Sequence, residues 1–339
     1  MKKLLVVGSN SIHTYNFILL VESYFDEVLL LTNQKNNNYQ VNSIEVDFSL
    51  GLSSLRVMKQ IKQVAHEYNP TTLHIQQANS YAFLTLMALD KYKCQKILTA
   101  WGSDVLINPK RSFLLKKMLQ YSLSKVESVT ADSNIVLEEA QAISKNKLDT
   151  HNINFGITPM QCTQNKENII YSNRLHKNLY NIDKIIISFS KFIIEYKNWK
   201  LIIAGSGDET DKLKGMVHSL GLNENVEFIG WVDTEKNYEY YCRSKIYVSI
   251  PKSDSVSLSL VEGIISGCIP FVSNLAANQE LVNSDLGFIV DDLENIPFEK
   301  YEEIDKELFE MKKKYVKKYF SKEFNRDKYI SLYKRANEN

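Results

Sequence analysis

The residues with the clearest potential for chemistry lie in one stretch, Ile250–Ser273, which reads IPKSDSVSLSLVEGIISGCIPFVS. A strand is expected to end at Pro251, and the serine-rich loop after it carries Asp254. A helix is expected to begin near Ser257 and to contain Glu262. Free N–H groups at a helix start can bind an anion or sugar hydroxyls, and the carboxylates can accept hydroxyl hydrogen bonds. In the alternative interpretation, Asp254 and the serines cap the helix while Glu262 faces solvent.

A cationic segment follows another apolar run and could hold a negatively charged group. It reads YSNRLHKNLY over residues 171–180, and its cations are Arg174 and Lys177. An arginine guanidinium can bind a phosphate through two parallel hydrogen bonds. The alternative for Arg174 is a solvated position on the protein surface.

Together these two segments resemble glycosyltransferase family 4, the retaining enzymes of the GT-B fold. The family has two acidic residues separated by seven others, and Asp254 and Glu262 have this spacing. The continuation 263–272 is similar to the family pattern E-A-x-x-x-G-x-P-V-V. The resemblance implies that Glu262 binds the ribose hydroxyls of a nucleotide sugar and that Asp254, where the family usually has Glu, holds the transferred sugar. The backbone groups that would assist Asp254 are those of Ser255, Val256 and Ser257.

The cationic segment is similar to the family's G-R-L…K-G-x-D-x-L-I segment, in which the Arg and the Lys neutralise the donor diphosphate. Cations are needed there because a departing nucleoside diphosphate gains negative charge in the transition state. In the usual spacing the Lys falls at Leu179, so Lys177 is expected to replace it, whereas Lys184 is expected to be solvated. The departing phosphate, held by Arg174 and Lys177, is expected to take the proton of the acceptor hydroxyl.

Two further loops of the second half are similar to family segments that contact the donor. Gly205 and Gly207 stand in the sequence AGSGDE after an apolar run, which resembles the family's G-x-G-x-E loop. The alternative is an ordinary tight turn between a strand and a helix. The segment FIGWV, which ends at Val232, is similar to the one whose backbone contacts the donor base.

The loop after the first apolar run contains Gly8 and Ser9 and precedes His13. It lacks a complete G-x-G-x-x-G pattern, which argues against a nicotinamide-dependent enzyme. The resemblance implies that this loop faces the donor phosphates and the acceptor, and that His13 is a candidate for a polar role at the reacting centre. A histidine that merely occupies a helix start is the alternative.

The segment LTAWGSD is similar to the T-x-H-G-x-D loop of many family members, with Trp101 in the place of the His. Asp104 retains the acidic position and could bind hydroxyls of the donor or the acceptor. Its alternative is a helix cap or an Asx turn. His74, at the end of another apolar run, is expected to be a core histidine, with a position lining the ligand cleft as the alternative.

Short apolar runs that alternate with helical patterns must position these residues. Such a rhythm is typical of parallel sheets covered by helices on both faces, so the predicted fold is α/β with two Rossmann-like, doubly wound domains. The runs of the first half are Leu4–Gly8, Val28–Thr32, Leu73–Gln76, Lys96–Ala100 and Ser128–Ala131. Those of the second half are Ile169–Ser172, Lys200–Ala204, Val226–Ile229, Ile246–Ile250, Ile269–Val272 and Gly287–Val290.

A polar stretch, Asn152–Asn168, interrupts this rhythm and predicts a domain boundary. We expect an acceptor-binding domain at 1–160, a linker at 161–167 and a nucleotide-sugar-binding domain at 168–315. A charged helical tail, 316–339, is expected to pack back toward the first domain. Ligands of doubly wound sheets bind outside the carboxyl ends of the strands, so the two domains are expected to face each other across a cleft.

The composition excludes several other classes of protein. The chain has 339 residues, of which 44% are hydrophobic and 24% charged, and 41 Lys and Arg balance 40 Asp and Glu. This composition argues against a disordered chain, and the even charge predicts no nucleic-acid partner. No apolar run approaches the length of a membrane span, and the start of the chain is interpreted as a strand rather than a signal peptide. The four cysteines are widely spaced, which favours neither zinc nor a disulfide framework and suggests a reducing cytoplasm.

A short basic amphipathic segment, Lys110–Lys117, is the candidate for peripheral contact with the inner face of a membrane, and a helix with solvated lysines is the alternative. The chain contains no D-x-D sequence, so neither a metal site nor a cofactor is expected. The predicted activity is retaining transfer of a hexosyl or N-acetylhexosaminyl group from a UDP- or GDP-sugar to a glycan or lipid-linked acceptor, in cell-surface polysaccharide or glycoconjugate biosynthesis. The alternatives are a sugar-nucleotide epimerase of the same fold and a catalytically degenerate nucleotide-sugar-binding module.

Overall fold

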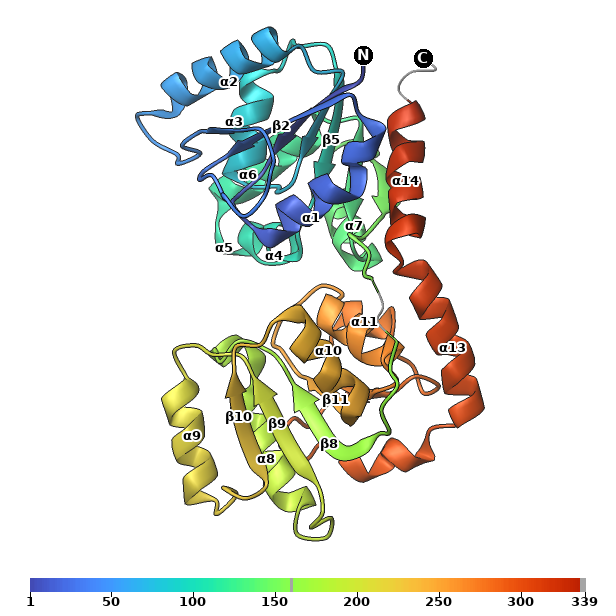
Figure 1. The fold of residues 1–339 in the computed structure, drawn as a ribbon. Helices are drawn as coiled ribbons and strands as arrows, with labels where there is room; N and C mark the ends of the chain where they lie inside the picture. Colours follow the sequence, from blue (N-terminus) through green and yellow to red (C-terminus); the bar gives the residue numbers. More distant parts are fainter. Residues whose placement is uncertain (159–160, 336–339) are drawn as a thin grey trace. The chain divides into compact units, whose positions relative to one another are not determined.

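The computed structural model describes residues 1–158 and 161–335 and divides into two compact units, each built around a parallel sheet (Figure 1). Unit 1 comprises residues 1–156 together with the chain from Lys322 onward, and unit 2 comprises Ile157–Ser321. The prediction of two doubly wound α/β domains is therefore confirmed.

The sheet of unit 1 has the strand order β3-β2-β1-β4-β5-β6-β7, and all its neighbouring strands are parallel. The strands are β1 (Lys3–Val7), β2 (Glu27–Thr32), β3 (Ser43–Glu45), β4 (Thr72–Ile75), β5 (Gln95–Thr99), β6 (Ser128–Ala131) and β7 (Asp149–Asn152). The helices are α1 (Ile12–Val21), α2 (Ser54–Tyr68), α3 (Ser80–Ala88), α4 (Gly102–Leu106), α5 (Asn108–Arg111), α6 (Phe113–Leu123), α7 (Asn134–Ile143) and α14 (Lys322–Arg335), with a 3₁₀ turn at Glu22–Tyr24.

The sheet of unit 2 has the strand order β10-β9-β8-β11-β12-β13 and is likewise parallel throughout. The strands are β8 (Glu167–Ser172), β9 (Lys200–Ala204), β10 (Val226–Gly230), β11 (Ser244–Ser249), β12 (Ile269–Ser273) and β13 (Phe288–Val290). The helices are α8 (Ile182–Phe192), α9 (Thr210–Ser219), α10 (Thr234–Arg243), α11 (Leu258–Ile265), α12 (Ala276–Gln279) and α13 (Lys306–Tyr319), with 3₁₀ turns at Asn178–Tyr180 and Phe298–Glu303.

Two strands of unit 1, β3 and β7, were not predicted from the sequence. Both lie at the edges of the sheet, and neither contains a buried residue. Because an edge strand is covered on fewer sides, its sequence does not need the apolar run that identifies a central strand. β7 reads DTHN and has no apolar side chain at all.

The core of unit 1 has two layers, one on each face of the sheet. Along β1, Leu5 and Val7 pack into one hydrophobic cluster, whereas Leu4 and Val6 pack into the other. This alternation follows from the period of two residues along a strand. The second cluster includes residues of α14, which contacts α1 within this unit (Figure 1).

A buried histidine joins helix α14 to the sheet of unit 1 through a hydrogen bond. His74 on β4 is fully buried, and its Nδ1 lies 2.8 Å from the Tyr333 hydroxyl of α14. Its Nε2 lies 2.8 Å from the Thr99 hydroxyl of β5. His74 is therefore a core histidine, as the sequence favoured.

The C-terminal tail was expected to leave the second domain at residue 316, but the chain returns to unit 1 later than that. Helix α13 runs to Tyr319 and packs against α11, so it remains part of unit 2. The backbone N–H of Ile157 also donates to the carbonyl of Phe320, at 2.8 Å, which pairs the two ends of unit 2. The return to unit 1 consequently begins at Lys322.

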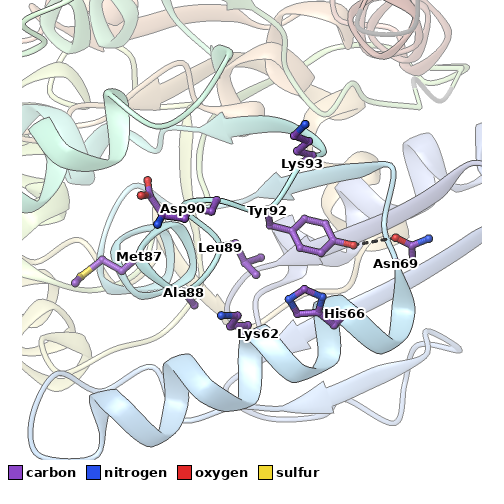
Figure 2. A pocket seen from close by; sticks show the side chains of 10 residues that line it. Lys62, His66, Asn69, Met87, Ala88, Leu89, Asp90, Tyr92 and Lys93 are labelled. Carbon is purple, nitrogen blue, oxygen red and sulfur yellow. Dashed lines mark hydrogen bonds between the residues drawn. The ribbon is translucent and has the colours of Figure 1, made fainter.

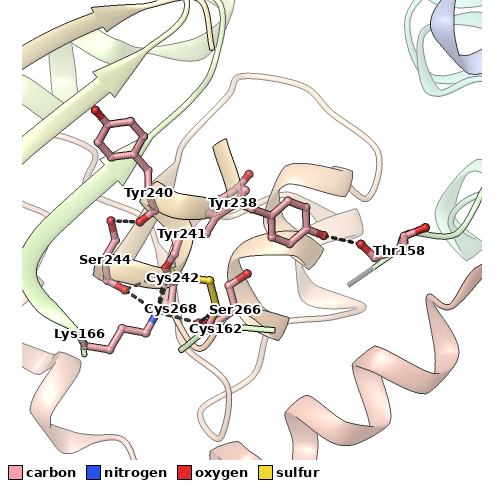
Figure 3. The surroundings of a disulfide bond; sticks show 10 residues. All are labelled: Thr158, Cys162, Lys166, Tyr238, Tyr240, Tyr241, Cys242, Ser244, Ser266 and Cys268. Carbon is pink, nitrogen blue, oxygen red and sulfur yellow. Dashed lines mark hydrogen bonds between the residues drawn. A yellow bond between two sulfur atoms is a disulfide. The ribbon is translucent and has the colours of Figure 1, made fainter. Parts of the chain in front are cut away.

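The segment expected to be a linker, 161–167, is packed into unit 2 (Figure 3). Cys162 forms a disulfide with Cys242 at the end of α10, and their Cα atoms lie 5.2 Å apart. The Lys166 ammonium donates to three backbone carbonyls, those of Tyr241, Ser244 and Ser266. The expectation that the cysteines form no disulfide is thus wrong, because the fold brings together two residues that are 80 positions apart.

A cavity of about 760 Å³ lies between the ends of α2 and α3 (Figure 2). Its lining includes His66, Met87 and Tyr92, and the Tyr92 hydroxyl donates to Asn69 Oδ1 at 3.0 Å. These residues precede β4 and β5, so the cavity lies at the amino edge of the sheet. It contains none of the site residues predicted from the sequence.

The first prediction concerns the acid sensitivity that His74 gives to the fold. Burial lowers the pKa of His74 to about 3, so the folded protein resists a protonation that the unfolded chain undergoes near its ordinary value. The contribution of His74 to the free energy of unfolding is therefore complete above about pH 6.5, and it is lost progressively as the pH falls toward 3. Between pH 7 and 4.5 we expect the free energy of unfolding to fall by about 2–3 kcal/mol from this group alone.

Urea unfolding of the wild type and of His74→Gln at both pH values measures this contribution. The variant is expected to be less stable at pH 7 but to lose less stability on acidification. An equal loss in both proteins would contradict the assignment.

Candidate functional site

The predicted donor-binding residues gather at the carboxyl ends of β8 and β11. These strands are neighbours at the point where the strand order of unit 2 reverses, β10-β9-β8 on one side and β11-β12-β13 on the other. Doubly wound sheets bind ligands at such a switch point. Arg174 follows β8, whereas Asp254 and Ser257 follow β11, so two loops that are distant in sequence meet here.

Arg174 is the centre of this arrangement. Its Nη2 lies 2.6 Å from Asp254 Oδ2, and its Nη1 donates to the Ser257 hydroxyl. The guanidinium also stands 4.5 Å from the centre of the Tyr180 ring. With 11% of its side chain exposed, Arg174 is not a solvated surface arginine.

The electrostatics keep Arg174 charged in spite of its burial. Burial disfavours the cation, but the Asp254 carboxylate, with Tyr247 and Tyr180, outweighs that effect and raises the pKa of the guanidinium. The Asp254 side chain is 23% exposed, so the ion pair lies only partly in water. The loop therefore presents a permanent cation beside the start of α11.

The N-cap side chain of α11 does not cap the helix, in contrast to the alternative interpretation for this serine. Ser257 occupies the N-cap position, but its side chain makes no capping hydrogen bond and instead accepts from Arg174. Asp254 Oδ1 accepts from the N–H of Ser255, at 3.1 Å, within its own loop. The first-turn N–H groups of a helix need partners from outside the helix, and here the N-cap side chain is not one of them.

Glu262 lies inside α11 and does not face open solvent. Burial raises the pKa of its carboxyl to about 7, and a hydrogen bond with Tyr241 opposes that rise. The next residue, Gly263, packs so closely on β11 that an added Cβ would lie 3.0 Å from Tyr247 Cγ. The absence of a side chain at Gly263 thus lets α11 approach the sheet and brings Glu262 against the tyrosines beneath it.

The glycine loop after β9 supports the arginine loop by close packing. An added Cβ at Gly205, whose φ is +99°, would lie 2.7 Å from the carbonyl oxygen of Arg174. At Gly207 it would lie 2.5 Å from the carbonyl oxygen of His176. Both glycines therefore set the position of the backbone that carries Arg174.

The remaining candidates of unit 2 lie near this edge of the sheet. Lys177 is exposed on the loop that carries Arg174. Val232 lies between β10 and α10, next to Trp231, whose side chain is 76% exposed. Ser255 and Val256 belong to the Asp254 loop, and Val256 is buried.

The candidates of unit 1 lie at the carboxyl edge of its own sheet. Gly8 directly follows β1, and an added Cβ there would lie 2.9 Å from Thr14 of α1. Next to it, the Ser9 carbonyl accepts from the N–H of Ser11, at 2.7 Å, just before α1 begins. This turn fixes the start of the helix that carries His13.

His13 is exposed on the first turn of α1 and belongs to an aromatic group. Its ring centre lies 5.5 Å from that of Trp101, in an edge-to-face arrangement, and 5.8 Å from that of Phe155, in a stacked one. The structure thus brings His13 together with the residue that replaces the family's histidine.

Asp104 is buried in the first turn of α4. Its Oδ2 accepts from the N–H of Ala78 at 2.8 Å, and burial raises the pKa of its carboxyl to about 6. The side chain therefore joins the loop after β4 to the loop after β5.

No sequence motif identified Asn173 or the residues that it contacts, which are Asn237, Tyr241 and Tyr247. Asn173 occupies the place of the glycine in the family's G-R-L segment, and that departure is the signal that could have identified it.

Within residues 1–158 and 161–335, no group of three His, Cys, Asp or Glu side chains could hold a metal ion. No helix in the same part of the chain is long and apolar enough to cross a bilayer.

Comparison with protein families assigns both halves of the chain. The family described as Glycosyl transferases group 1 matches residues 161–298, and the family described as Glycosyl transferase 4-like matches residues 2–133. The first match includes Arg174, Asp254 and Glu262.

Curated relatives are distant. Alpha-monoglucosyldiacylglycerol synthase of Streptococcus pneumoniae is 24% identical over 252 residues, which cover 71% of this chain and 55% of the relative. O-antigen chain mannosyltransferase C of Escherichia coli is 20% identical over 226 residues, which cover 62% of this chain and 57% of the relative. The chain thus spans little more than half the length of these two relatives.

Solved structures share the fold over nearly their whole length. HepE of Anabaena in complex with UDP and glucose superposes with a TM-score of 0.80 at 12% identity, covering 98% of this chain and 99% of that one. A glycosyltransferase of Rickettsia africae superposes with a TM-score of 0.80 at 16% identity, covering 100% and 99% of the two chains. With two consecutive family matches on this two-domain fold, the chain belongs to the group 1, family 4-like glycosyltransferases of the GT-B fold.

Proposed function

We propose that this glycosyltransferase moves a hexosyl or N-acetylhexosaminyl group, with retention of configuration, from a UDP- or GDP-sugar to a glycan or lipid-linked acceptor. The observation that carries the proposal is the contact of Arg174 with Asp254 and Ser257 at the switch point of unit 2. HepE, whose structure contains UDP and glucose, and the lipopolysaccharide galactosyltransferase WaaB share this fold and support a nucleotide-sugar donor and a cell-surface glycan product.

In the proposed mechanism, the diphosphate, the ribose and the sugar of the donor are each bound by different residues of the site. Arg174, assisted by Lys177, binds the diphosphate and stabilises the charge that it gains as the glycosidic bond to the donor breaks. Glu262 accepts hydrogen bonds from the ribose, and Asp254 with the backbone of 255–257 holds the sugar. The departing phosphate takes the proton of the acceptor hydroxyl on the same face, so the mechanism needs no separate general base, metal or cofactor.

The first test of this proposal is the phosphate assignment. Arg174→Gln removes the fork of charged donors, and we expect the affinity for UDP or GDP to fall by about 100-fold, as for the loss of about 2–3 kcal/mol of charge-assisted hydrogen bonding. Isothermal titration measures the affinity.

Arg243→Gln is the matched control. It removes an arginine that pairs with Glu167, at the opposite end of β8, and it should leave the affinity unchanged. Full nucleotide affinity of a folded Arg174→Gln variant would defeat the assignment.

The second test concerns retention and the metal. Incubation of the wild type with labelled UDP- and GDP-sugars, an acceptor mixture and a chelator should yield a product whose anomeric configuration is that of the donor, as read by proton NMR. An inverted product would contradict retention, and activity that returns only with Mg²⁺ would contradict a metal-free reaction.

The same assay separates the two alternative functions. Release of free nucleotide without an acceptor would identify an epimerase, and binding without turnover would identify a degenerate binding module.

We further propose that the acceptor is presented at an anionic membrane surface on the inner face, with the protein in the cytoplasm. The helices α5 and α6 carry Lys110, Arg111, Lys116 and Lys117, and they expose 75% of Phe113 and 65% of Leu114. Cations that flank exposed apolar side chains are typical of helices that bind a bilayer surface. The name of the pneumococcal relative, a glucosyldiacylglycerol synthase, points to the same class of acceptor. The disulfide does not support a reducing compartment, so this localisation depends on the lipid argument.

Sedimentation with vesicles tests the membrane proposal. We expect the wild type to bind phosphatidylglycerol vesicles more tightly than phosphatidylcholine vesicles, and Lys116→Gln with Lys117→Gln to weaken binding by about 1 kcal/mol per lysine. Phe113→Ser with Leu114→Ser should weaken it further. The control is Lys317→Gln with Lys318→Gln, a basic pair on α13, and an equal loss in that variant would refute the role of α6.

A further inference from the structure

Two residues with different proposed ligands, Arg174 for the diphosphate and Asp254 for the sugar, are bonded to each other. Asp254 Oδ2 lies 2.6 Å from Arg174 Nη2, and the Ser257 hydroxyl accepts from Arg174 Nη1. Both terminal nitrogens of the guanidinium are therefore engaged by the loop that precedes α11. A phosphate that binds an arginine through two parallel hydrogen bonds needs such a pair of nitrogens. A diphosphate and Asp254 would thus compete for the same cation.

Asp254 is a strong competitor because the ion pair is largely removed from water. The Arg174 side chain is 11% exposed and that of Asp254 is 23% exposed. The other groups that stabilise the cation are the phenols of Tyr247 and Tyr180. Since water screens charges weakly in such a place, a carboxylate and a phosphate on one guanidinium repel each other strongly. A diphosphate therefore needs the carboxylate to move away before it can bind the guanidinium.

Other bonds hold the two loops together when this ion pair opens. The N–H of Lys252 donates to the Leu179 carbonyl at 2.8 Å, and Asn181 Nδ2 donates to the Ile250 carbonyl at 2.8 Å. Neither bond involves the charged groups of the pair. The backbone on both sides is thus fixed independently, so the Asp254 side chain can turn away without separating the loops.

We propose that Asp254 makes Arg174 selective for an intact sugar nucleotide over the free nucleoside diphosphate. Without a donor, the carboxylate holds the guanidinium. When a sugar nucleotide binds, its diphosphate replaces the carboxylate, and the hydroxyls of its sugar bind the displaced carboxylate. A nucleoside diphosphate lacks that sugar, so it displaces Asp254 without compensation. This inference rests on the proposed function, in which Arg174 binds the diphosphate and Asp254 the sugar.

The same competition favours release of the product. After transfer, the sugar no longer occupies Asp254, while the nucleoside diphosphate still occupies Arg174. The carboxylate then competes again for the guanidinium, and the ion pair re-forms as the nucleotide leaves.

Asp254→Asn removes the competing charge with almost no change in the shape of the side chain. We expect the affinity for UDP and GDP to rise by about 10-fold, since the ion pair is intermediate between an exposed pair and a buried charge-assisted bond. The affinity for the preferred member of a panel of UDP- and GDP-hexoses should rise less, because the variant also loses the charged acceptor for the sugar hydroxyls. The preference for sugar nucleotide over nucleoside diphosphate is therefore expected to fall.

Isothermal titration of the full chain measures these affinities in the wild type, Asp254→Asn, Arg174→Gln and the double variant. In the Arg174→Gln background there is no guanidinium to compete for, so Asp254→Asn should change the affinity for UDP and GDP by less than about twofold. Simple repulsion between the carboxylate and the phosphates does not require Arg174. An equal or larger gain in that background would therefore overturn the inference.

Asp291→Asn is the matched control. Asp291 directly follows β13 at the same edge of the sheet, and its Oδ1 accepts from Asn274 Nδ2 at 2.7 Å, a role that an amide oxygen retains. The variant removes one negative charge from this edge and leaves the Arg174 ion pair intact, so both affinities should stay unchanged. A gain equal to that of Asp254→Asn would attribute the effect to net charge and would contradict the inference.

If Asp254→Asn fails to fold by circular dichroism, Asp254→Ser gives the same comparison, because its hydroxyl is likewise uncharged. A folded wild type that binds neither nucleoside diphosphates nor sugar nucleotides would refute the donor site, and the inference with it. Nucleotide binding that the Asp254 variant leaves unchanged or weakens would refute the inference alone. So would a gain for UDP and GDP that the preferred sugar nucleotide matches in full.

Discussion

The ion pair between Arg174 and Asp254 is the interaction on which the organisation of unit 2 around its site depends. It joins the loop after β8 to the loop after β11, and two hydrogen bonds reinforce the junction. The N–H of Lys252 donates to the Leu179 carbonyl at 2.8 Å, and Asn181 Nδ2 donates to the Ile250 carbonyl at 2.8 Å. A cation this deeply placed needs a partner, because an unpaired buried charge costs several kcal/mol. The pair thus explains why these two loops have one defined arrangement.

The central elements could be predicted from the sequence because burial imposes a pattern on them. Every strand of unit 2 lies on a predicted apolar run, and in unit 1 only the polar edge strands β3 and β7 escaped detection. Arg174, Asp254 and Glu262 were singled out by their resemblance to the family motifs, and each follows or lies within an element that the pattern located. The proximity of Arg174 and Asp254 then follows from the strand order, which brings the ends of β8 and β11 together.

Contacts between residues that are far apart in the sequence produce no such local pattern, so the sequence did not predict them. Cys162 and Cys242 are 80 positions apart, and nothing in their spacing distinguishes them from Cys94 and Cys268, which are free. The bond between His74 and Tyr333 spans 259 positions. The cluster around Asn173 consists of asparagines and tyrosines, types that occupy turns and surfaces as readily as buried networks. Such contacts depend on the packing of several elements at once, which a single sequence does not show.

The carboxyl edges of the two sheets differ in their side-chain chemistry, and the difference agrees with the donor and acceptor parts proposed for them. Unit 2 presents the permanent cation of Arg174 beside a helix start, which suits a diphosphate. Unit 1 presents the rings of His13 and Trp101, and burial moves the pKa of Asp104 up to about 6. Aromatic faces beside a carboxylate suit a neutral, hydroxyl-rich ligand better than a diphosphate, because the carboxylate repels phosphate charge. The proposed division of donor and acceptor between the two units therefore accords with the chemistry of their own side chains.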